Sequence, residues 1–196
     1  YAQTTMPVSS ATLLDLSPQE LSLLQERLRG AQPAVAVGLP AADRSTNAFP
    51  HSLVQEQVWF VEQLHAGTGT FNIPAAVRLH GDLDVEALKQ ALAAVVARHE
   101  VLRTPFEAEG GSPVQVVQDQ MDVPMSTFDL SSVPEAELDQ RLRTLAVDFS
   151  SQAFDLATGP LLRVALFELS AQEHLLLVVT HHIVSDATSQ RLFFQA

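Results

Sequence analysis

The sequence predicts an α+β fold in which a mixed β-sheet is flanked by helices. Stretches with an apolar residue at every third or fourth position, typical of amphipathic helices, alternate with short β-type runs. Near the end of the chain, an apolar run over residues 161–169 and a second run ending at His181 are separated by a turn, which predicts an antiparallel hairpin. The second run is rich in Leu and Val and predicts a strand that is buried on both faces.

Composition narrows the possible functions. The 196 residues are enough for one domain or for part of a larger one. No cysteine is present, which excludes disulfides, thiolate nucleophiles and cysteine-ligated metals. The 23 acidic and 11 basic side chains give a net charge of −12, which disfavours a nucleic-acid partner. No apolar run approaches the ~20 residues of a membrane span and no signal-peptide pattern is seen, so we expect a cytoplasmic protein without a membrane partner.

The chain divides into an N-terminal extension and a globular part. Residues 1–50 form the predicted extension and residues 51–196 the globular part. Within the extension, Ser17 is an N-cap for a helix over about residues 17–29. The Ala- and Pro-rich residues 31–50 predict an extended linker. The helix either docks a partner protein or lies on its own domain.

Three further helices are expected in the globular part. Ser52 begins the first, Asp84 caps the second, and Ser132 with Glu135 makes a capping box for the third. Their predicted buried stripes are, in order, Val54, Val58, Val61 and Leu64; Val85, Leu88, Leu92, Val95, His99 and Leu102; and Leu138, Leu142, Leu145 and Phe149.

Between the helices, the sequence predicts additional strands. Residues 75–80 and 123–128 are expected to be single strands, and residues 106–117 a hairpin that turns at residues 109–112.

The strongest candidate site follows the last predicted strand. His181 and His182 stand where that strand ends, and Ser185 or Asp186 can cap a helix that begins near Thr188. Successive side chains of an extended segment point to opposite faces. Only one histidine can therefore face a given cleft, and the other is expected to be held in the scaffold.

The residues alone leave three interpretations of this histidine pair. Both rings can be purely structural. His182 and Asp186, four residues apart, can share a face and bind a metal, although no other His or Cys cluster completes the ligand set. One histidine can also act as a general base while the aspartate supports the local structure or balances charge.

Three stretches carry a family resemblance. Residues 181–187 fit His-His-x-x-x-Asp-Gly, except that Ala187 stands in the Gly position. Residues 98–106 fit Arg-His-Glu-x-Leu-Arg-Thr-x-Phe at every defined position. Residues 52–59 match Ser-x-Ala-Gln-x-Arg-Leu/Met-Trp only at its Ser, Gln and Trp positions. In this order, the three stretches resemble the motifs of condensation domains of nonribosomal peptide synthetases.

The resemblance implies a chloramphenicol acetyltransferase-like fold. In such a fold, two similar lobes form a V with a tunnel between them, and the histidine motif lies near its middle. The globular part is less than half as long as a complete condensation domain. It therefore resembles the N-terminal lobe, with the C-terminal lobe missing, and we expect this fragment alone to be inactive.

The resemblance also implies roles for individual residues. His182 is the expected catalytic residue, as a base or as a positioner of the amine, and His181 and Asp186 are expected to be structural. Arg103 is the expected ion-pair partner of Asp186. Ala187 and Ser189 are expected to line the donor tunnel, which the methyl group of Ala187 narrows without blocking. No metal is expected.

The implied reaction joins two tethered substrates through an amide bond. Upstream and downstream peptidyl carrier proteins are the expected partners, and each carries its thioester on 4'-phosphopantetheine, with no cofactor bound by the domain itself. Three alternatives remain within the superfamily: a coenzyme A-dependent acyltransferase, an epimerisation domain, and a non-catalytic carrier-docking module. The complete match over residues 98–106 favours condensation over the first two.

Overall fold

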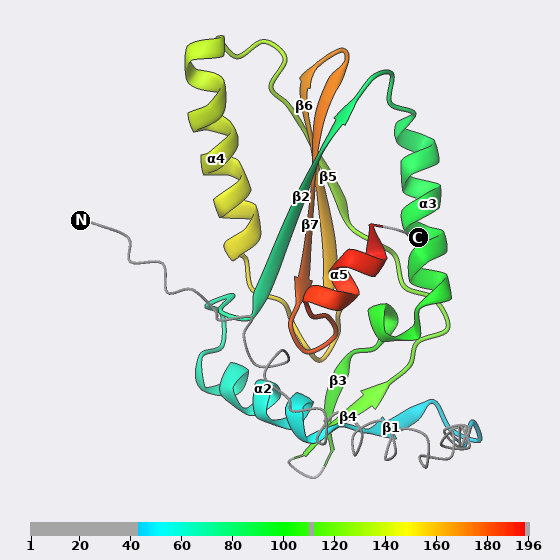
Figure 1. Ribbon diagram of the computed structural model, residues 1–196. Coiled ribbons are helices and arrows are strands. Elements are labelled where there is room, and N and C mark those ends of the chain that lie inside the picture. The colour runs from blue at the N-terminus through cyan, green and yellow to red at the C-terminus, as the bar shows by residue number, and fades with distance from the viewer. Residues whose placement is uncertain (1–42, 110–111, 195–196) are drawn as a thin grey trace, which may run out of the picture. The chain divides into compact units, whose positions relative to one another are not determined.

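The computed structural model of this protein describes residues 43–109 and 112–194 (Figure 1). The predicted helix over residues 17–29 and most of the predicted linker lie outside these ranges. The elements in chain order are β1 (Ala48–Pro50), α2 (Leu53–Leu64), β2 (Asn72–His80), α3 (Val85–Arg98), the 3-10 turn η1 (Glu100–Arg103), β3 (Phe106–Glu109), β4 (Ser112–Val116), β5 (Met125–Asp129), α4 (Glu135–Ser151), β6 (Leu162–Ser170), β7 (Glu173–His181) and α5 (Ala187–Phe193).

A four-stranded mixed sheet forms the centre of the fold. Its strand order is β2-β7-β6-β5. β7 is antiparallel to both of its neighbours, whereas β5 runs parallel to β6. The predicted hairpin between the last two strands is confirmed, with Leu166 opposite Leu176. Helices α3 and α4 cover opposite faces of this sheet (Figure 1).

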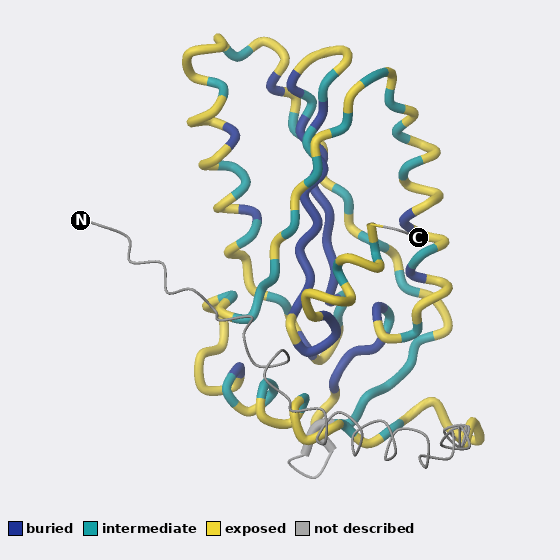
Figure 2. The backbone as a smooth tube through the Cα atoms, viewed as in Figure 1, coloured by how far each residue is buried: buried dark blue, intermediate teal, exposed yellow. Residues whose placement is uncertain are grey.

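The two faces of the sheet make two separate cores. Along β6, Val164 and Leu166 pack toward α3, while Ala165 and Phe167 pack toward α4, as the two-residue period of a strand requires. All four side chains are fully buried. Figure 2 shows the buried residues gathered in the central strands. The prediction of a strand buried on both faces is thus confirmed for β7, whose residues 176–181 are all buried.

A second, three-stranded sheet was not predicted. The hairpin of β3 and β4 turns where the sequence indicated, with Glu109 opposite Ser112, but it pairs with β1 instead of joining the central sheet. β1 lies in the stretch predicted to be a linker, so that prediction is wrong for residues 48–50. Three residues, one of them Pro50, are too short and too irregular to give a strand signal.

The buried face of α2 also differs from the prediction. Val54 and Leu64 are 68% and 65% exposed, whereas Trp59 is partly buried and Glu62 is buried. α2 carries apolar residues on both sides, so hydrophobic periodicity could not select its orientation. In the observed orientation, Val58 and Trp59 pack against a buried cluster that includes Ile183, and Gln55 donates a hydrogen bond to the backbone carbonyl of Ile183, 3.3 Å away.

The other helices follow the prediction more closely. Asp84 caps α3 through the backbone N–H of Ala87, and the predicted stripe of α4 packs in the core. Two details are wrong. α4 begins after Pro134 without a side-chain cap, because the extended backbone of Pro134 occupies the N-cap position where Ser132 was expected to act. α3 ends at Arg98, so that His99 is exposed rather than part of a buried stripe.

Candidate active site

The end of β7 separates the two histidines, as strand alternation requires. His181 is 1% exposed, whereas His182 is exposed. Backbone hydrogen bonds fix both residues, since the N–H of His181 donates to the carbonyl of Leu161 and that of His182 to the carbonyl of Phe71. The loop that follows therefore starts from a rigid position, which suits a reactive side chain.

Within the described residues, the hydrogen bond of the His182 ring is made by Nδ1. Nδ1 lies 2.8 Å from the backbone carbonyl oxygen of Ser185. A carbonyl oxygen only accepts hydrogen bonds, so Nδ1 carries the proton in this contact. In the neutral ring, Nε2 then holds the lone pair. The ring lines a pocket of about 610 Å³ between residues 70–73 and the start of α5, and it can accept a proton from a substrate there.

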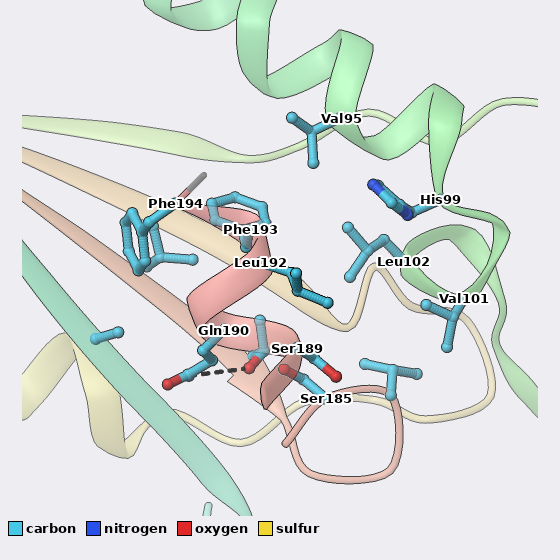
Figure 3. A pocket seen from close by; sticks show the side chains of 14 residues that line it. Val95, His99, Val101, Leu102, Ser185, Ser189, Gln190, Leu192, Phe193 and Phe194 are labelled. Carbon is cyan, nitrogen blue, oxygen red and sulfur yellow. Dashed lines mark hydrogen bonds between the residues drawn. The ribbon is translucent and has the colours of Figure 1, made fainter. Parts of the chain in front are cut away.

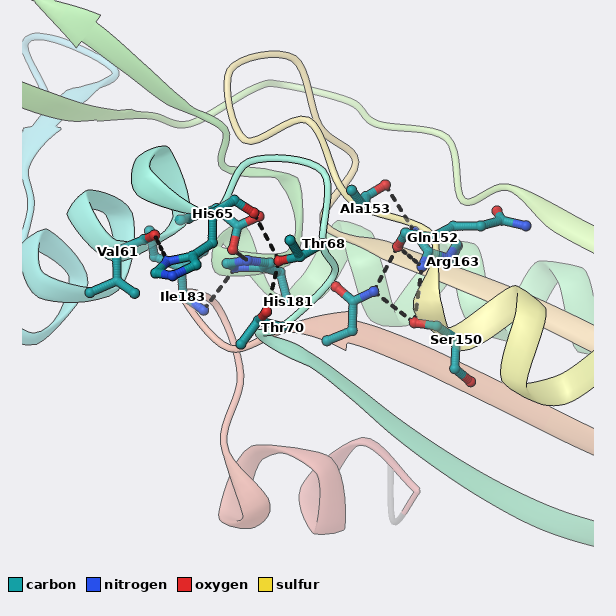
Figure 4. Close-up of polar contacts among 12 residues, drawn as sticks. Val61, His65, Thr68, Thr70, Ser150, Gln152, Ala153, Arg163, His181 and Ile183 are labelled. Carbon is teal, nitrogen blue, oxygen red and sulfur yellow. Dashed lines mark hydrogen bonds and ion pairs between the residues drawn. The ribbon is translucent and has the colours of Figure 1, made fainter.

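His181 is packed into the scaffold behind the loop. Its Nδ1 accepts a hydrogen bond from the backbone N–H of Ile183 at 3.2 Å (Figure 4). The rings of Phe71 and Phe154 lie 6.0 and 6.1 Å from the imidazole centroid. Burial, together with the neighbouring His182, lowers the pKa of His181 to about 4. His181 is therefore neutral near pH 7, with its proton on Nε2.

Asp186 stands directly before the first residue of α5. Its Oδ1 accepts hydrogen bonds from the backbone N–H and the hydroxyl of Ser189, both at 2.7 Å. These bonds lower the pKa of the Asp186 carboxyl below its usual range. Asp186 is thus the N-cap of α5, one of the two caps that the sequence offered.

Arg103 does not pair with Asp186 in the part of the chain that the structure describes. Its guanidinium donates to the backbone carbonyl of Gln118 and lies 3.6 Å from Glu100. Glu100 also binds Arg44 at 2.7 Å. Arg103 therefore fixes the segment between η1 and β5, and the predicted pairing with Asp186 is not formed. Motif spacing could not reveal this, because Gln118 lies outside the motifs.

Motif residues on α2 and β3 pack against the loop that follows β7, residues 182–186, which we call the histidine loop. Phe106, Ile183 and Val184 are buried in one cluster, against which Trp59 packs. Gln55 reaches the same loop through the carbonyl of Ile183. Each of the three motif stretches thus contributes to a single local structure, although they are far apart in the sequence.

Two pockets flank α5, and the two predicted tunnel residues line different ones. Ala187 lines the same pocket as His182. Ser189 lines a smaller apolar pocket of about 140 Å³ between α5 and α3, shown in Figure 3. Gln190 lines both pockets, and its Nε2 donates to the backbone carbonyl of Ile73 at 2.9 Å.

Comparison with known proteins agrees with this geometry. The sequence model of the family described as "Condensation domain" matches residues 45–196. The chain belongs to the condensation domain family. It is 37% identical over 185 residues to a linear gramicidin synthase of Brevibacillus parabrevis and 43% identical over 149 residues to Cyclosporin synthetase simA of Tolypocladium inflatum. These alignments cover 94% and 76% of the chain, but only 2% and 1% of the relatives.

Solved structures share this fold. The starter condensation domain of rhizomide synthetase RzmA superposes with a TM-score of 0.70 at 21% identity, covering 76% of this chain and 37% of that one. SgcC5 protein from Streptomyces globisporus superposes with a TM-score of 0.65 at 29% identity, covering 75% and 34%. The predicted chloramphenicol acetyltransferase-like fold is confirmed, and the partial coverage agrees with the N-terminal lobe of a condensation domain.

Condensation domains are acyltransferases. In this chain, two buried charged residues near the histidine loop and the central sheet were not identified from the sequence. Glu62 on α2 lies 3.6 Å from Nε2 of His181. Arg163 on β6 is 9% exposed and donates to carbonyl groups at the C-terminal end of α4 (Figure 4). The one sequence signal for Glu62 and Arg163 was that each is a charged residue within a mostly apolar stretch.

The structure gives two further observations on metals and membranes. Within residues 43–109 and 112–194, no group of three or more His, Asp and Glu side chains comes together in a way that could hold a metal ion. None of the helices in this part of the condensation domain is long and apolar enough to cross a membrane.

Proposed function

We propose that this chain is the catalytic-histidine lobe of a domain that forms an amide bond between a donor acyl or peptidyl thioester and the amine of an acceptor aminoacyl thioester. The observation that carries the proposal is the orientation of His182. Its Nδ1 is held by the carbonyl of Ser185 and its ring lines an open pocket, so Nε2 is free to accept a proton.

The proposed reaction needs little from the protein besides geometry and one proton acceptor. The nitrogen of the acceptor amine attacks the carbonyl carbon of the donor thioester, a C–N bond forms, and the C–S bond breaks. The amine loses a proton to Nε2 of His182, and the departing thiolate takes up a proton to become a thiol. A thioester is already activated, so holding both substrates in place supplies much of the rate.

The substrates are proposed to arrive on partner proteins. An upstream and a downstream peptidyl carrier protein would each present a thioester on a 4'-phosphopantetheine arm. The similarity to synthetases such as the gramicidin and cyclosporin enzymes supports these partners. The domain itself would bind no cofactor for the chemistry, since the proton acceptor is one of its own side chains.

The neighbours of His182 are proposed to shape the approach of the donor arm. Ala187 lines the pocket beside His182, and its methyl group would narrow the passage without blocking it. Ser189 lines the adjoining apolar pocket, and its hydroxyl donates a hydrogen bond to the carboxylate of Asp186, the N-cap of α5. A C-terminal lobe would supply the opposite wall, so the lobe alone is proposed to be inactive.

A single-turnover assay with matched histidine variants tests this function. The complete condensation domain that contains this chain would be mixed with a loaded donor carrier and a loaded acceptor carrier, and the product on the acceptor carrier would be measured by intact-protein mass spectrometry. We expect His182→Ala to lower the rate by roughly 100-fold or more. His80→Ala is the control. His80 is exposed at the C-terminal end of β2, whereas the pocket of His182 lies at the N-terminal end, so this substitution should leave the rate unchanged.

Two results would overturn the proposal. One is full activity of His182→Ala. The other is a domain that transfers no acyl group between carriers but acylates a free amine from a coenzyme A thioester, which would indicate a coenzyme A-dependent acyltransferase instead.

A further inference from the structure

The mechanism proposed above does not use Glu62, although this residue is buried directly beneath the histidine loop. Glu62 is 4% exposed and His181 is 1% exposed. Oε2 of Glu62 lies 3.6 Å from Nε2 of His181, and neither atom has a hydrogen-bond partner in the described part of the chain. A carboxyl group is costly to bury, so its position against a histidine needs a physical reason.

The tautomer of His181 supplies that reason. The backbone N–H of Ile183 donates to Nδ1 of His181, so Nδ1 cannot carry a proton in the neutral ring. The proton is then on Nε2, which faces Oε2 of Glu62. A carboxyl oxygen accepts this proton in a hydrogen bond after a small approach of the two groups. Burial raises the pKa of Glu62, and Oε2 can serve as an acceptor whether the carboxyl is protonated or not.

The ring of His181 is connected to the reactive histidine by a short rigid path. His181 binds the N–H of Ile183, and His182 is the residue between them. From the same helix as Glu62, Gln55 donates to the carbonyl of Ile183. α2 therefore meets both polar groups of the Ile183 backbone, one directly through Gln55 and one through the Glu62–His181 pair.

We propose that Glu62 is a positioning residue for the condensation reaction: it accepts the Nε2 proton of His181 and thereby holds the turn that presents His182 to the pocket. This role rests on the proposed function of His182. Glu62 touches neither substrate, and its effect passes through His181 and the backbone of Ile183.

Three variants of the complete condensation domain separate this role from a general loss of structure. Glu62→Leu removes the acceptor, Glu62→Gln keeps an acceptor oxygen without the charge, and Glu56→Leu is the matched control. Glu56 lies on the same helix and 3.4 Å from another histidine, His51, but its side chain is 50% exposed. Far-UV circular dichroism checks that each variant folds.

The kinetic result expected is a change in kcat without a change in KM. Glu62→Leu should lower kcat by roughly tenfold or more, because a displaced His182 misses the reacting amine, while KM for both carriers stays within about twofold. Glu62→Gln should recover most of the loss, and Glu56→Leu should match the unaltered domain. An unchanged kcat in a folded Glu62→Leu variant would overturn the proposal.

Nitrogen-15 NMR of the histidine side chains decides the same question without any turnover. In the unaltered domain, His181 should carry its proton on Nε2, and Glu62→Leu should shift the ring signals of His182 whereas Glu56→Leu should not. A proton on Nδ1 of His181 would overturn the proposal, even if Glu62→Leu does not fold. If the unaltered domain forms no amide bond, the proposed function fails, while the NMR result still decides the role of Glu62.

Discussion

Nδ1 of His182 lies 2.8 Å from the carbonyl oxygen of Ser185, three residues later in the same loop. This contact engages Nδ1 of a ring that lines the pocket beside α5. It involves the backbone of Ser185 rather than its side chain. The orientation of His182 therefore depends on the shape of the loop.

The burial of His181 makes the stability of the chain depend on pH. The pKa of His181 falls from 6.5 to about 4 on folding, so the unfolded state binds the proton more tightly. The resulting stability is fully present above pH 6.5 and is lost as the pH falls toward 4. The loss is on the order of 3 kcal/mol at most.

Urea unfolding between pH 4.5 and pH 7 measures this effect. His181→Asn should show a shallower loss of unfolding free energy than the unaltered chain. The comparison is needed because Glu62, whose pKa burial raises, has the opposite pH dependence. Equal slopes in the two proteins would mean that the pKa of His181 does not fall on folding.

Asp186 should act as a helix cap that is energetically independent of Arg103. Asp186→Ala should destabilise the chain by about 1 kcal/mol, because Ser189 loses its hydrogen-bond acceptor. Asp186→Asn should retain most of that stability. The two side chains share no partner, so the effects of Asp186→Ala and Arg103→Ala in a double-mutant cycle should add to within about 0.5 kcal/mol. A larger coupling energy would be evidence that the predicted ion pair between Asp186 and Arg103 does form.

Ala187→Gly should not stabilise the chain, even though glycine occupies this position in the family motif. In the described residues, only glycines have positive φ, so Ala187 is unstrained in the first turn of α5. The glycine variant should have a free energy of unfolding lower by about 0.5 kcal/mol, because glycine increases the conformational entropy of the unfolded chain. Thermal unfolding measures the difference, and a higher midpoint for Ala187→Gly would indicate strain at Ala187.

Among the arginines that the structure describes, Arg163 should be the most sensitive for stability. Its guanidinium donates to the carbonyls of Phe149 and Gln152, and it lies 4.0 Å from the ring centroid of Phe154. Arg163→Met should cost roughly 2–4 kcal/mol, because the carbonyls at the end of α4 lose their donors. Arg163→Lys should recover little, since one ammonium cannot reach the same set of acceptors.

The control for Arg163 is an exposed arginine on the same sheet. Arg78 on β2 pairs with Glu173 and its side chain is 48% exposed. Arg78→Met should cost no more than about 1 kcal/mol. Similar losses of unfolding free energy for the two substitutions would show that the α4 contacts of Arg163 contribute little.

Local signals in the sequence were sufficient to predict most elements of the central sheet. Asp84 is a strong helix cap, and the apolar runs on either side of the turn near residue 171 are close enough in sequence to be predicted as a hairpin. Strand alternation also predicted that His181 and His182 face opposite sides. These features depend on neighbours in the sequence, which is why they could be predicted from it.

The features that could not be predicted depend on distant contacts. The orientation of α2 depends on contacts with the histidine loop, among them the hydrogen bond from Gln55 to a carbonyl 128 residues away. The partner of Arg103 is a backbone carbonyl in a segment without any motif. Glu62 follows the only tryptophan by three residues and is buried because His181 lies opposite. No local pattern indicates which distant group a buried polar side chain will meet.

The claim that His182 accepts the proton of the attacking amine depends most directly on which ring nitrogen is free. Nitrogen-15 NMR of the side-chain nitrogens of His182, recorded in the complete domain at a pH where the ring is neutral, measures this. We expect a protonated Nδ1 and an unprotonated Nε2. A proton found on Nε2 would contradict this expectation, because Nε2 could then only donate a hydrogen bond and could not accept the proton of the amine.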